Sequence, residues 1–369
     1  MIPLEAAQFE ALIPAHAAGR TRIVPATEAG AWDAFVRSHP HGTLYHLFAW
    51  KDVIEETYGH ATHYLTAFNE SSSGNYSGGA VSGILPLVHL GHFLFGNSLV
   101  SIPFFDMGGV LADDTDSERE LIAAAVRLGQ ELKIENIELR HPRRIPGPWP
   151  SNTNKVRMLL DLPDSAEDLM KGFKAKLRSQ IKKAVKEGLR AEIGGAELLD
   201  DFYEVFLVNM RDLGSPVHAK RLMQNVLRHF PSEARVVVVR HGGQAIAGSI
   251  LVGFRDVLEN PWASALRRFS HLNANMLLYW SMLEYACENG FKKFDFGRST
   301  PDEGTYKFKA QWGAKSEPFH WVNIPLKGQK VESSIAEDKK FQLAAALWKK
   351  FPLPVTRLLG PVIRKHISL

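Results

Sequence analysis

The segment from Asn275 to Gly313 decides the fold of this chain, and it reads NMLLYWSMLEYACENGFKKFDFGRSTPDEGTYKFKAQWG. A helical pattern over Asn275–Asn289 leads into a short apolar strand that begins at Lys293 and ends in the run Asp295–Ser299. A loop dense in lysine and aromatic residues follows. This order places polar groups at the carboxyl end of a strand, the edge at which ligands of α/β proteins usually bind. The segment therefore predicts an α/β domain with a binding site at this edge.

A weak internal repeat indicates that the chain contains two such domains. Each half has a strand, a glycine-rich turn and a second strand, which is the signature of a hairpin. These are residues 63–68, 78–79 and 80–85 in the first half, and residues 235–240, 242–243 and 245–251 in the second. A helical pattern and a short strand follow in both halves, at 118–132 and 136–140 and again at 275–289 and 293–296. The expected fold class is α/β (α+β), with mixed sheets flanked by helices.

The length of the chain also favours two domains, because one hydrophobic core rarely serves 369 residues. A proline-rich stretch at residues 142–150 precedes the strand pattern Lys155–Leu162, which we assign to the end of the first domain. The predicted domains are residues 1–163, residues 164–328 beginning with a basic helix, and a basic helical tail over residues 329–369.

Composition excludes several classes of protein. The chain has 45% hydrophobic and 23% charged residues, as soluble globular proteins do, with no apolar run long enough for a membrane span and no signal-peptide pattern. We therefore expect a cytoplasmic protein. The single cysteine, Cys287, rules out an internal disulfide and suits a reducing compartment. A net charge of +4 does not indicate a DNA-binding protein.

Common catalytic and metal-binding signatures are missing from the sequence. It contains no Ser-His-Asp order, GxSxG elbow, P-loop or GxGxxG fingerprint, which disfavours hydrolases, kinases and dehydrogenases. The spacing of His39, His41 and His46 does not define a zinc site, and no cysteine supports one. We therefore expect no metal.

Three motifs together carry a resemblance to a known family. They are Arg178 with Ile181–Ala184, the run Met210–Val217, and the block from Asp295 to Trp312. With them the chain resembles the FemAB family over roughly residues 30–325, and most closely the subgroup linked to exopolysaccharide and PEP-CTERM sorting loci. This family consists of transferases built from two acyltransferase (GNAT-like) domains.

The resemblance implies two tandem GNAT-like domains and transfer of an acyl or aminoacyl group to an amine. The acceptor would be a cell-envelope glycan or a lipid-linked precursor. No tightly bound cofactor is implied, since the donor substrate would be an acyl-CoA or an aminoacyl-tRNA, the latter making tRNA a partner. The sequence lacks the usual pyrophosphate loop of acetyl-CoA-using GNAT enzymes, which weakens the acetyl-CoA alternative. Direct attack by the amine, without a covalent enzyme intermediate, would leave the protein to position the reactants and stabilise the oxyanion.

Basic residues of the second half are candidates for binding phosphates. Along the helical pattern Lys171–Lys186, one row contains Arg178 and Lys182, which a solvated helix face would explain equally well. The resemblance favours these two as substrate-binding residues. Arg211 either contacts an anionic acceptor or stabilises the end of its own helix.

The strand end and the following loop supply the candidates for chemistry. Asp295 would orient or deprotonate the amine and Arg298 would bind phosphate or carboxylate, unless the two only pair with each other or cap a helix. Alternation over residues 306–309 suggests a strand that separates Tyr306 from Lys307 and Lys309, although lysines are also common on edge strands. The resemblance implies that Lys307 or Lys309 lies on the donor side and stabilises negative charge.

The first half contributes fewer candidates. Asp106, in the stretch Ser101–Gly109 between an apolar strand and a double-glycine turn, would orient the acceptor amine, although a turn-capping aspartate is the ordinary alternative. Trp50 and Lys51 loosely resemble a substrate-contact segment of the family.

The tail allows a peripheral position at the inner face of the membrane. Trp348, Phe351 and the lysines and arginines around them would rest on anionic lipid, or they form a plain surface. A further alternative for the whole chain is a non-catalytic relative that binds glycan precursors in an exopolysaccharide or protein-sorting system.

Overall fold

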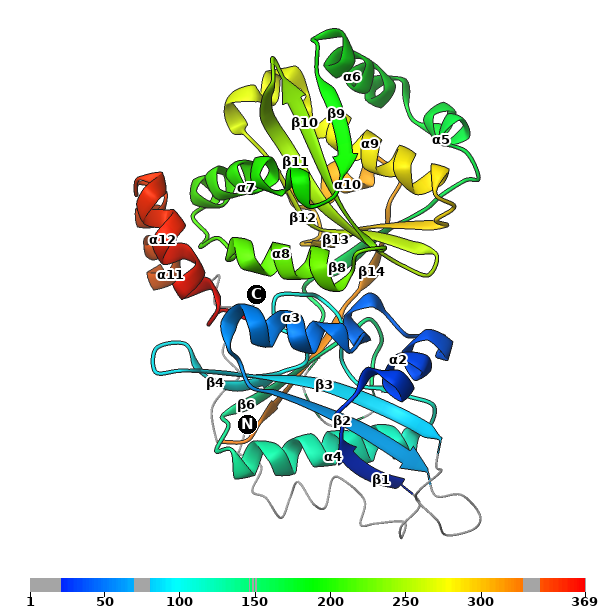
Figure 1. Cartoon of the computed structure of the whole chain (residues 1–369), viewed down its shortest axis with the longest axis vertical. Coiled ribbons are helices and arrows are strands. Elements are labelled where there is room, and N and C mark those ends of the chain that lie inside the picture. Colours follow the sequence, from blue (N-terminus) through cyan, green and yellow to red (C-terminus); the bar gives the residue numbers. More distant parts are fainter. Residues whose placement is uncertain are drawn as a thin grey trace. The chain divides into compact units, whose positions relative to one another are not determined.

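The structure is a computed structural model that describes residues 21–69, 80–145, 147, 149, 151–327 and 339–368. The chain forms two compact units (Figure 1). The first comprises residues up to Thr153 together with Pro318–Ser333 and His366–Leu369, and the second comprises Asn154–Glu317 and Ser334–Lys365. No described helix has the length and apolar content needed to cross a membrane.

A mixed sheet forms the centre of the first unit. Its strand order is β1-β2-β3-β4-β6-β15-β7, with β5 paired to β3. The strands are β1 (Thr21–Pro25), β2 (Thr62–Asn69), β3 (Val81–His92), β4 (Gly96–Val100), β5 (Leu111–Ala112), β6 (Asn136–His141), β7 (Ser151–Asn152) and β15 (His320–Pro325). Helix α4 (Thr115–Glu131) covers one face, and α2 (Ala29–Ser38) and α3 (Ala49–Tyr58) lie on the other (Figure 1). Buried side chains of α4, including Leu121 and Val126, pack against Leu85, Ile137 and Val322 of the sheet.

The second unit has a sheet with helices on both faces. Its strand order is β14-β8-β13-β12-β11-β10-β9. The strands are β8 (Val156–Asp161), β9 (Arg190–Gly194), β10 (Ala234–His241), β11 (Gln244–Phe254), β12 (Val257–Ala265), β13 (Lys293–Ser299) and β14 (Lys315–Pro318). Its helices are α5 (Ala166–Gly172), α6 (Ala175–Lys186), α7 (Leu199–Leu213), α8 (Lys220–His229), α9 (Ala274–Glu288), α10 (Gly304–Ala310), α11 (Lys339–Trp348) and α12 (Leu353–Arg364).

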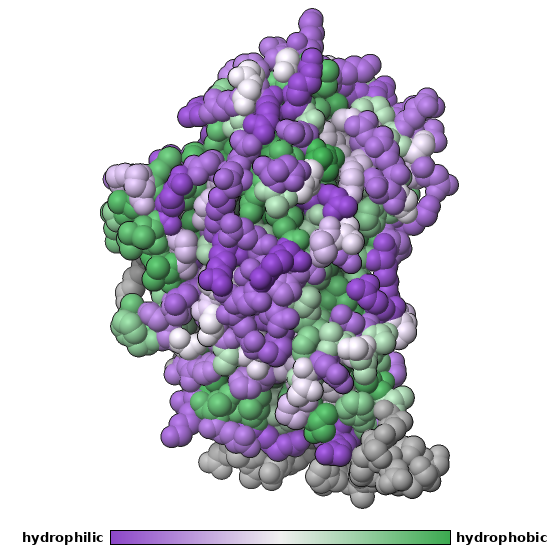
Figure 2. All heavy atoms as spheres, viewed as in Figure 1, coloured by the Kyte–Doolittle hydropathy of each residue, from purple (hydrophilic) through white to green (hydrophobic). Residues whose placement is uncertain are grey.

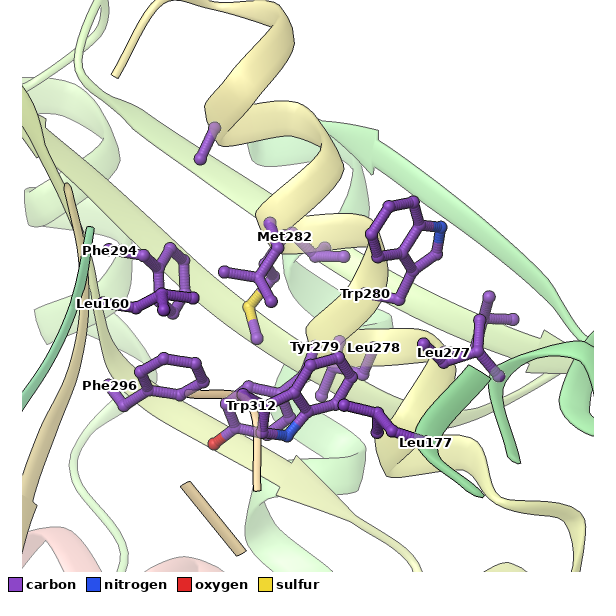
Figure 3. Packing of buried hydrophobic residues seen from close by; sticks show 14 of the residues in the cluster. Leu160, Leu177, Leu277, Leu278, Tyr279, Trp280, Met282, Phe294, Phe296 and Trp312 are labelled. Carbon is purple, nitrogen blue, oxygen red and sulfur yellow. The ribbon is translucent and has the colours of Figure 1, made fainter. Parts of the chain in front are cut away.

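Helix α9 is the centre of the second unit's core. It is apolar on nearly every side and buries residues from Leu277 to Cys287, as expected for a helix enclosed within a domain. Figure 3 shows its side chains between the sheet, where Phe294 and Phe296 lie, and Leu177 of α6. Helix α7 packs against the sheet through residues such as Phe202, which approaches the backbone of Gly248. The helix and strand predicted for residues 275–296 are therefore present.

Two strands lie in different sheets from those their sequence neighbours suggested. Strand β8, assigned from sequence to the first domain, pairs antiparallel with β13 of the second unit. Strand β15, predicted to lie in the second domain, pairs along its whole length with β6 of the first unit. An apolar strand pattern specifies a buried strand but not its partner, so the boundary near residue 163 does not separate the two sheets. The predicted turn at residues 78–79 and the start of the predicted tail lie outside the described residues.

Residues 306–309 form part of helix α10 and not the strand that their alternation suggested. The reason is visible in the aromatic contacts of Phe308 and Trp312, which are one helical turn apart. Both rings approach Tyr279, with centroids at 4.9 Å and 6.1 Å. A helical turn brings side chains four residues apart close together, and the Phe308 and Trp312 ring centroids are 6.3 Å apart. In a strand the same spacing would separate the two residues by about 13 Å, so this contact requires the helical turn.

Candidate functional site

The two central parallel strands of the second unit separate partway along their length. Strands β12 and β13 are paired only from Val257–Lys293 to Glu259–Asp295, although they continue to Ala265 and Ser299. Helix α9 connects them. Backbone N–H and C=O groups are strong hydrogen-bonding groups, and strands that diverge offer them to an extended ligand. In the first unit, β4 and β6 are likewise parallel and paired over three residue pairs, but β4 ends at the last of them, Val100.

Buried charges lie at the point of divergence. Asp295 on β13 and Glu259 on β12 are 2% and 5% exposed. Arg157 on β8 donates a hydrogen bond from Nε to Asp295, and its Nη2 is 3.9 Å from Glu259 Oε1. Burial alone would lower the pKa of the Arg157 guanidinium, but the two carboxylates raise it above its usual value. Removing the charged Arg157 and the two carboxylates from water is costly unless they are well paired. Because the three residues come from β8, β12 and β13, their pairing fixes these strands relative to one another.

The second oxygen of Asp295 shapes the turn that follows. Its Oδ1 accepts a hydrogen bond of 2.8 Å from the backbone N–H of Gly297. Gly297 has φ of +71°, and the pairing of β13 with β8 is irregular between Asp295 and Arg298. A left-handed backbone favours glycine. In the Asp-Phe-Gly-Arg run, Gly297 therefore forms the bulge, and Asp295 accepts the hydrogen bond from its N–H.

Lys309 holds the same turn from helix α10. Its side chain is buried, and Nζ donates to the carbonyl oxygens of Gly297 at 3.2 Å and Arg298 at 2.7 Å. Its neighbour Lys307 is exposed. The structure thus brings Asp295, Arg298 and Lys309 together, and it places Lys307 on the outer side of the same short helix.

An aromatic layer with buried polar atoms lies on the α9 side of the strands. Tyr279 stacks on Phe296 with ring centroids 5.6 Å apart, and Asn260 Nδ2 lies 3.5 Å from the Tyr279 hydroxyl (Figure 3 shows both rings). Burial raises the pKa of Tyr279. The Asn260 Oδ1 and Ser299 Oγ atoms are buried without a hydrogen-bond partner among the described residues. Such atoms are costly, and both lie where the strands have separated.

The basic helix α6 borders a pocket of about 520 Å³. Arg178 lines it, yet its Nη1 also donates to the carbonyl oxygens of Lys171 and Phe173, so this side chain terminates helix α5. Trp280 and Glu284 of α9 form the opposite wall. Burial, followed by the charge of a neighbouring glutamate, raises the pKa of Glu284. Lys182 is exposed.

Two further predicted residues of the second unit have modest surroundings. Arg211 lies in the last turn of α7 and forms an ion pair of 2.7 Å with the adjacent Asp212. Tyr306 is half-buried on α10, with its hydroxyl 3.5 Å from Ser316 Oγ. These partners, Asp212 and Ser316, are not part of the cluster around Asp295.

In the first unit, Trp50 is a core residue. It is fully buried and donates from Nε1 to the carbonyl oxygen of Leu44, so no face of the ring is open to a substrate. Lys51 forms an ion pair of 2.8 Å with Glu55 one turn along α3. Of the two residues predicted to contact substrate, Trp50 therefore packs in the core, and Lys51 forms an ion pair along its own helix.

Asp106 lies on a loop that a buried arginine organises. Arg140 on β6 is fully buried and donates to the carbonyl oxygens of Ile102 and Phe105, and its guanidinium lies 5.2 Å from the centre of the Trp321 ring. Trp321 in turn donates to the carbonyl oxygen of Asp106 at 3.0 Å. The Asp106 side chain is half-buried on this loop.

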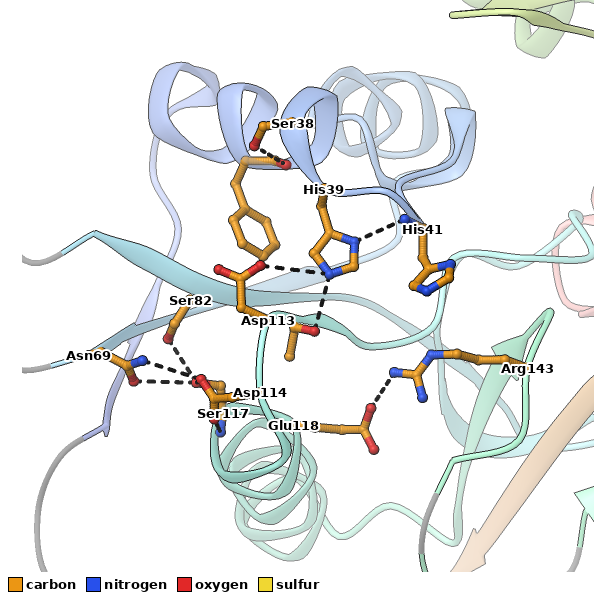
Figure 4. Close-up of polar contacts among 12 residues, drawn as sticks. Ser38, His39, His41, Asn69, Ser82, Asp113, Asp114, Ser117, Glu118 and Arg143 are labelled. Carbon is orange, nitrogen blue, oxygen red and sulfur yellow. Dashed lines mark hydrogen bonds and ion pairs between the residues drawn. The ribbon is translucent and has the colours of Figure 1, made fainter.

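The histidines of the first unit are held by hydrogen bonds. Figure 4 shows His39, whose Nε2 lies 3.1 Å from the carbonyl oxygen of Ala112 and 3.8 Å from Asp113. Nearby, Arg143 pairs with Glu118. Burial lowers the pKa of His46 to about 4. No group of three or more histidine, cysteine, aspartate or glutamate residues in the described part of the chain has a metal-binding arrangement.

Comparison with known proteins matches this geometry to one fold. Residues 171–310 match the family described as "Acetyltransferase (GNAT) domain". These residues therefore have a GNAT-like fold. The GNAT match includes α6, both diverging strands, α9 and α10, and it is the domain type of N-acyltransferases. No curated protein matches the chain in sequence.

Solved structures extend the likeness to both GNAT units. The crystal structure of FemX has a TM-score of 0.60 at 15% identity, covering 82% of this chain and 97% of that one. A tandem GNAT protein from the clavulanic acid biosynthesis pathway has a TM-score of 0.50 at 15% identity, covering 84% and 100%. A conserved protein of unknown function from Bacteroides thetaiotaomicron VPI-5482 has a TM-score of 0.51 at 10% identity, covering 81% and 98%. The tandem GNAT-like fold expected from sequence is confirmed.

Sequence reasoning missed the residues that hold the site together. Arg157, Glu259 and Asn260 were not candidates, because they lie in strand patterns that look like ordinary core. The available signal was one charged residue inside each of three apolar strands, namely Arg157, Glu259 and Asp295. Charged residues are seldom fully buried unless they are paired.

Proposed function

We propose that this chain is an N-acyltransferase of the FemAB type. It moves an acyl or aminoacyl group from an activated donor to an amine of a cell-envelope or exopolysaccharide precursor. The observation that carries the proposal is the divergence of β12 and β13 within the GNAT domain, with buried polar atoms of Asn260 and Ser299 beside it. An extended donor arm, the pantetheine of an acyl-CoA or the acceptor end of a tRNA, fits such an opening between strands.

The reaction requires few chemical groups from the protein. The acceptor nitrogen attacks the donor carbonyl carbon, a C–N bond forms, and the C–S bond of a thioester or the C–O bond of an ester breaks. The proton of the amine finally leaves with the thiol or hydroxyl product. Binding the reactants in this geometry and stabilising the tetrahedral oxyanion supply most of the rate.

The geometry suggests separate roles for the candidate residues. Both oxygens of Asp295 are occupied, by Arg157 and by the Gly297 N–H, so we assign Asp295 to positioning the bulge and not to accepting a proton. Lys309 holds the same bulge. Exposed Lys307 remains available to neutralise the donor's phosphates or the oxyanion. Asp106 of the first unit remains the candidate for orienting the acceptor amine.

For the class of acceptor, the proposal relies on the resemblance to the FemAB subgroup. It favours an exopolysaccharide or PEP-CTERM-linked precursor, glycan or lipid-linked, as acceptor. The basic surface of α6, with exposed Lys182 and Lys183, suits a phosphate-rich donor such as aminoacyl-tRNA. An acyl-CoA would use the same strand opening.

A non-catalytic function in binding glycan precursors is the second candidate. The hydrogen bonds of the Asp295 carboxylate favour it, because Arg157 and the Gly297 N–H already hold its two oxygens. In that case the fold would bind a precursor without transferring a group to it.

Donor binding and group transfer distinguish these candidates. Calorimetric titration with acetyl-CoA, longer acyl-CoAs and charged tRNA should find one donor class that binds, and a separate titration with UDP-sugar precursors measures binding of the glycan precursor. Lys307→Ala should weaken that binding, whereas Lys315→Ala, another exposed lysine of the same unit, should not. Transfer of a labelled acyl group to an amine acceptor would then establish the enzyme. Binding of a UDP-sugar precursor alone, without any donor, would establish the second candidate.

A further inference from the structure

The two C-terminal helices expose a concentration of large apolar side chains. On α11, Leu343 and Leu347 are 63% and 52% exposed, and on α12 Leu358 and Val362 are 73% and 57% exposed. Phe351, between the helices, is 42% exposed. Figure 2 shows hydrophobic residues gathered over this part of the molecule. Contiguous exposed apolar surface of this kind marks a site that contacts another apolar phase or molecule.

Helix α12 is oriented with its apolar side outward. Its buried residues are Thr356, Gly360 and Arg364. Arg364 Nε donates to Nε2 of His218 at 3.1 Å, and a Cβ on Gly360 would lie 2.8 Å from a methyl carbon of Val217. A small residue and a buried hydrogen bond therefore specify which side faces the protein. The same contacts turn the leucines of α12 toward the solvent, although burying one leucine side chain would stabilise the fold by about 2 kcal/mol.

The charges of this segment have one sign. From Gln342 to Ser368 the sequence has five lysine and arginine residues and no aspartate or glutamate. Lys349 and Lys350 are exposed where α11 ends, and Lys365 is half-buried where α12 ends. Arg357 is also half-exposed and pairs with Glu204 of α7 at 2.6 Å.

We propose that the α11–α12 surface, defined by Leu343, Leu347, Leu358, Val362, Lys349 and Lys350, binds the surface of an anionic phospholipid bilayer. Apolar side chains would enter the boundary between headgroups and acyl chains, and the lysines would contact lipid phosphates. The helices lie on the bilayer, since neither can span it. A second copy of the chain fits this surface less well, because it would bring two sets of lysines together. The inference is independent of the transfer chemistry.

The structure also changes which residues are the anchors. Trp348, one of the two aromatic residues expected from the sequence to rest on lipid, is 7% exposed and buried in the unit, whereas the other, Phe351, is 42% exposed. The outward leucine and valine of α12 were not singled out, because Pro352 and Pro354 break the helical pattern in sequence, whereas in the structure they stand at the start of α12.

Vesicle flotation of the full-length protein tests the proposal. The protein should float with phosphatidylglycerol vesicles and bind phosphatidylcholine vesicles much less. The double variant Leu358→Ser/Val362→Ser and the double variant Lys349→Glu/Lys350→Glu should each weaken binding at least about tenfold. The matched control is Val185→Ser, since Val185 is 49% exposed beside lysines on α6. Because all five positions are exposed, melting temperature and circular dichroism should remain as in the wild type.

Three results would overturn the proposal. The first is that the protein binds neither kind of vesicle. If it then also forms a concentration-dependent dimer that the Leu358→Ser/Val362→Ser variant abolishes, the surface is assigned to a second copy of the chain. The second is binding that both double variants leave unchanged. The third is binding lost only on Phe93→Ser/Leu94→Ser, at the exposed β3–β4 turn of the first unit, which would place the lipid contact there.

Discussion

Lowering the pH should reduce the stability of the first unit, and His46 should account for part of that loss. This side chain is 2% exposed, its Nδ1 lies 3.2 Å from the Thr43 backbone nitrogen, and its Nε2 lies 3.0 Å from the carbonyl oxygen of Gly109. A backbone N–H can only donate, so the ring is neutral, with its proton on Nε2. Burial is the largest cause that lowers its pKa, from 6.5 to about 4, and the charge of His39 adds to it.

The direction of the effect follows from proton binding. Between pH 6.5 and about 4 the unfolded chain binds a proton at His46 that the folded chain does not. The stabilisation is therefore complete above the unfolded pKa and is lost as the pH falls toward the folded pKa. At about 1.4 kcal/mol per pKa unit, this difference corresponds to roughly 3 kcal/mol over the whole window.

Urea unfolding from about pH 7 to about pH 5 measures this contribution. The free energy of unfolding of wild type should fall by roughly 2 kcal/mol more than that of His46→Gln, which retains an amide donor for Gly109. His41→Gln, which removes an exposed histidine of the same segment, should follow the wild type. Parallel pH curves for wild type and His46→Gln would refute the reasoning, because the buried ring would then make no difference to proton uptake.

Three further substitutions test the packing. Arg157→Met should lower the free energy of unfolding of the second unit by about 3–5 kcal/mol, because it removes the buried cation beside two buried carboxylates, and adding Asp295→Asn should recover part of the loss in urea melts. Gly297→Ala should cost about 1–2 kcal/mol, seen as a lower melting temperature, through its positive φ alone, since a Cβ there meets open space. Gly109→Ala should lower the melting temperature of the first unit by overlap with the buried His141 ring, at a cost of about 1–3 kcal/mol, whereas Gly30→Ala should not.

The sequence was sufficient to predict the fold class and the central segment, because hydrophobic periodicity and turn residues are local. The helix over residues 274–288 and the strand ending at Ser299 follow that pattern directly. Partners of a strand are not local, so the pairing of β8 with β13 could not be read from its residues. The same limit concealed Arg157, whose charge has meaning only beside Asp295 and Glu259 from two other strands. For residues 306–309, four positions were too few to separate a two-residue from a four-residue period.

The position of β15 has a consequence for synthesis of the chain. This strand, made of residues 320–325, lies between β6 and β7 of the first sheet, yet it follows the whole β8–β14 segment of the second unit in sequence. A ribosome therefore releases most of the second unit before the first can complete its sheet, and until then β6 has an edge open to pairing with other chains. The sheet that begins first is completed last, and a nascent chain stalled before residue 320 would present that open edge to the cell's chaperones.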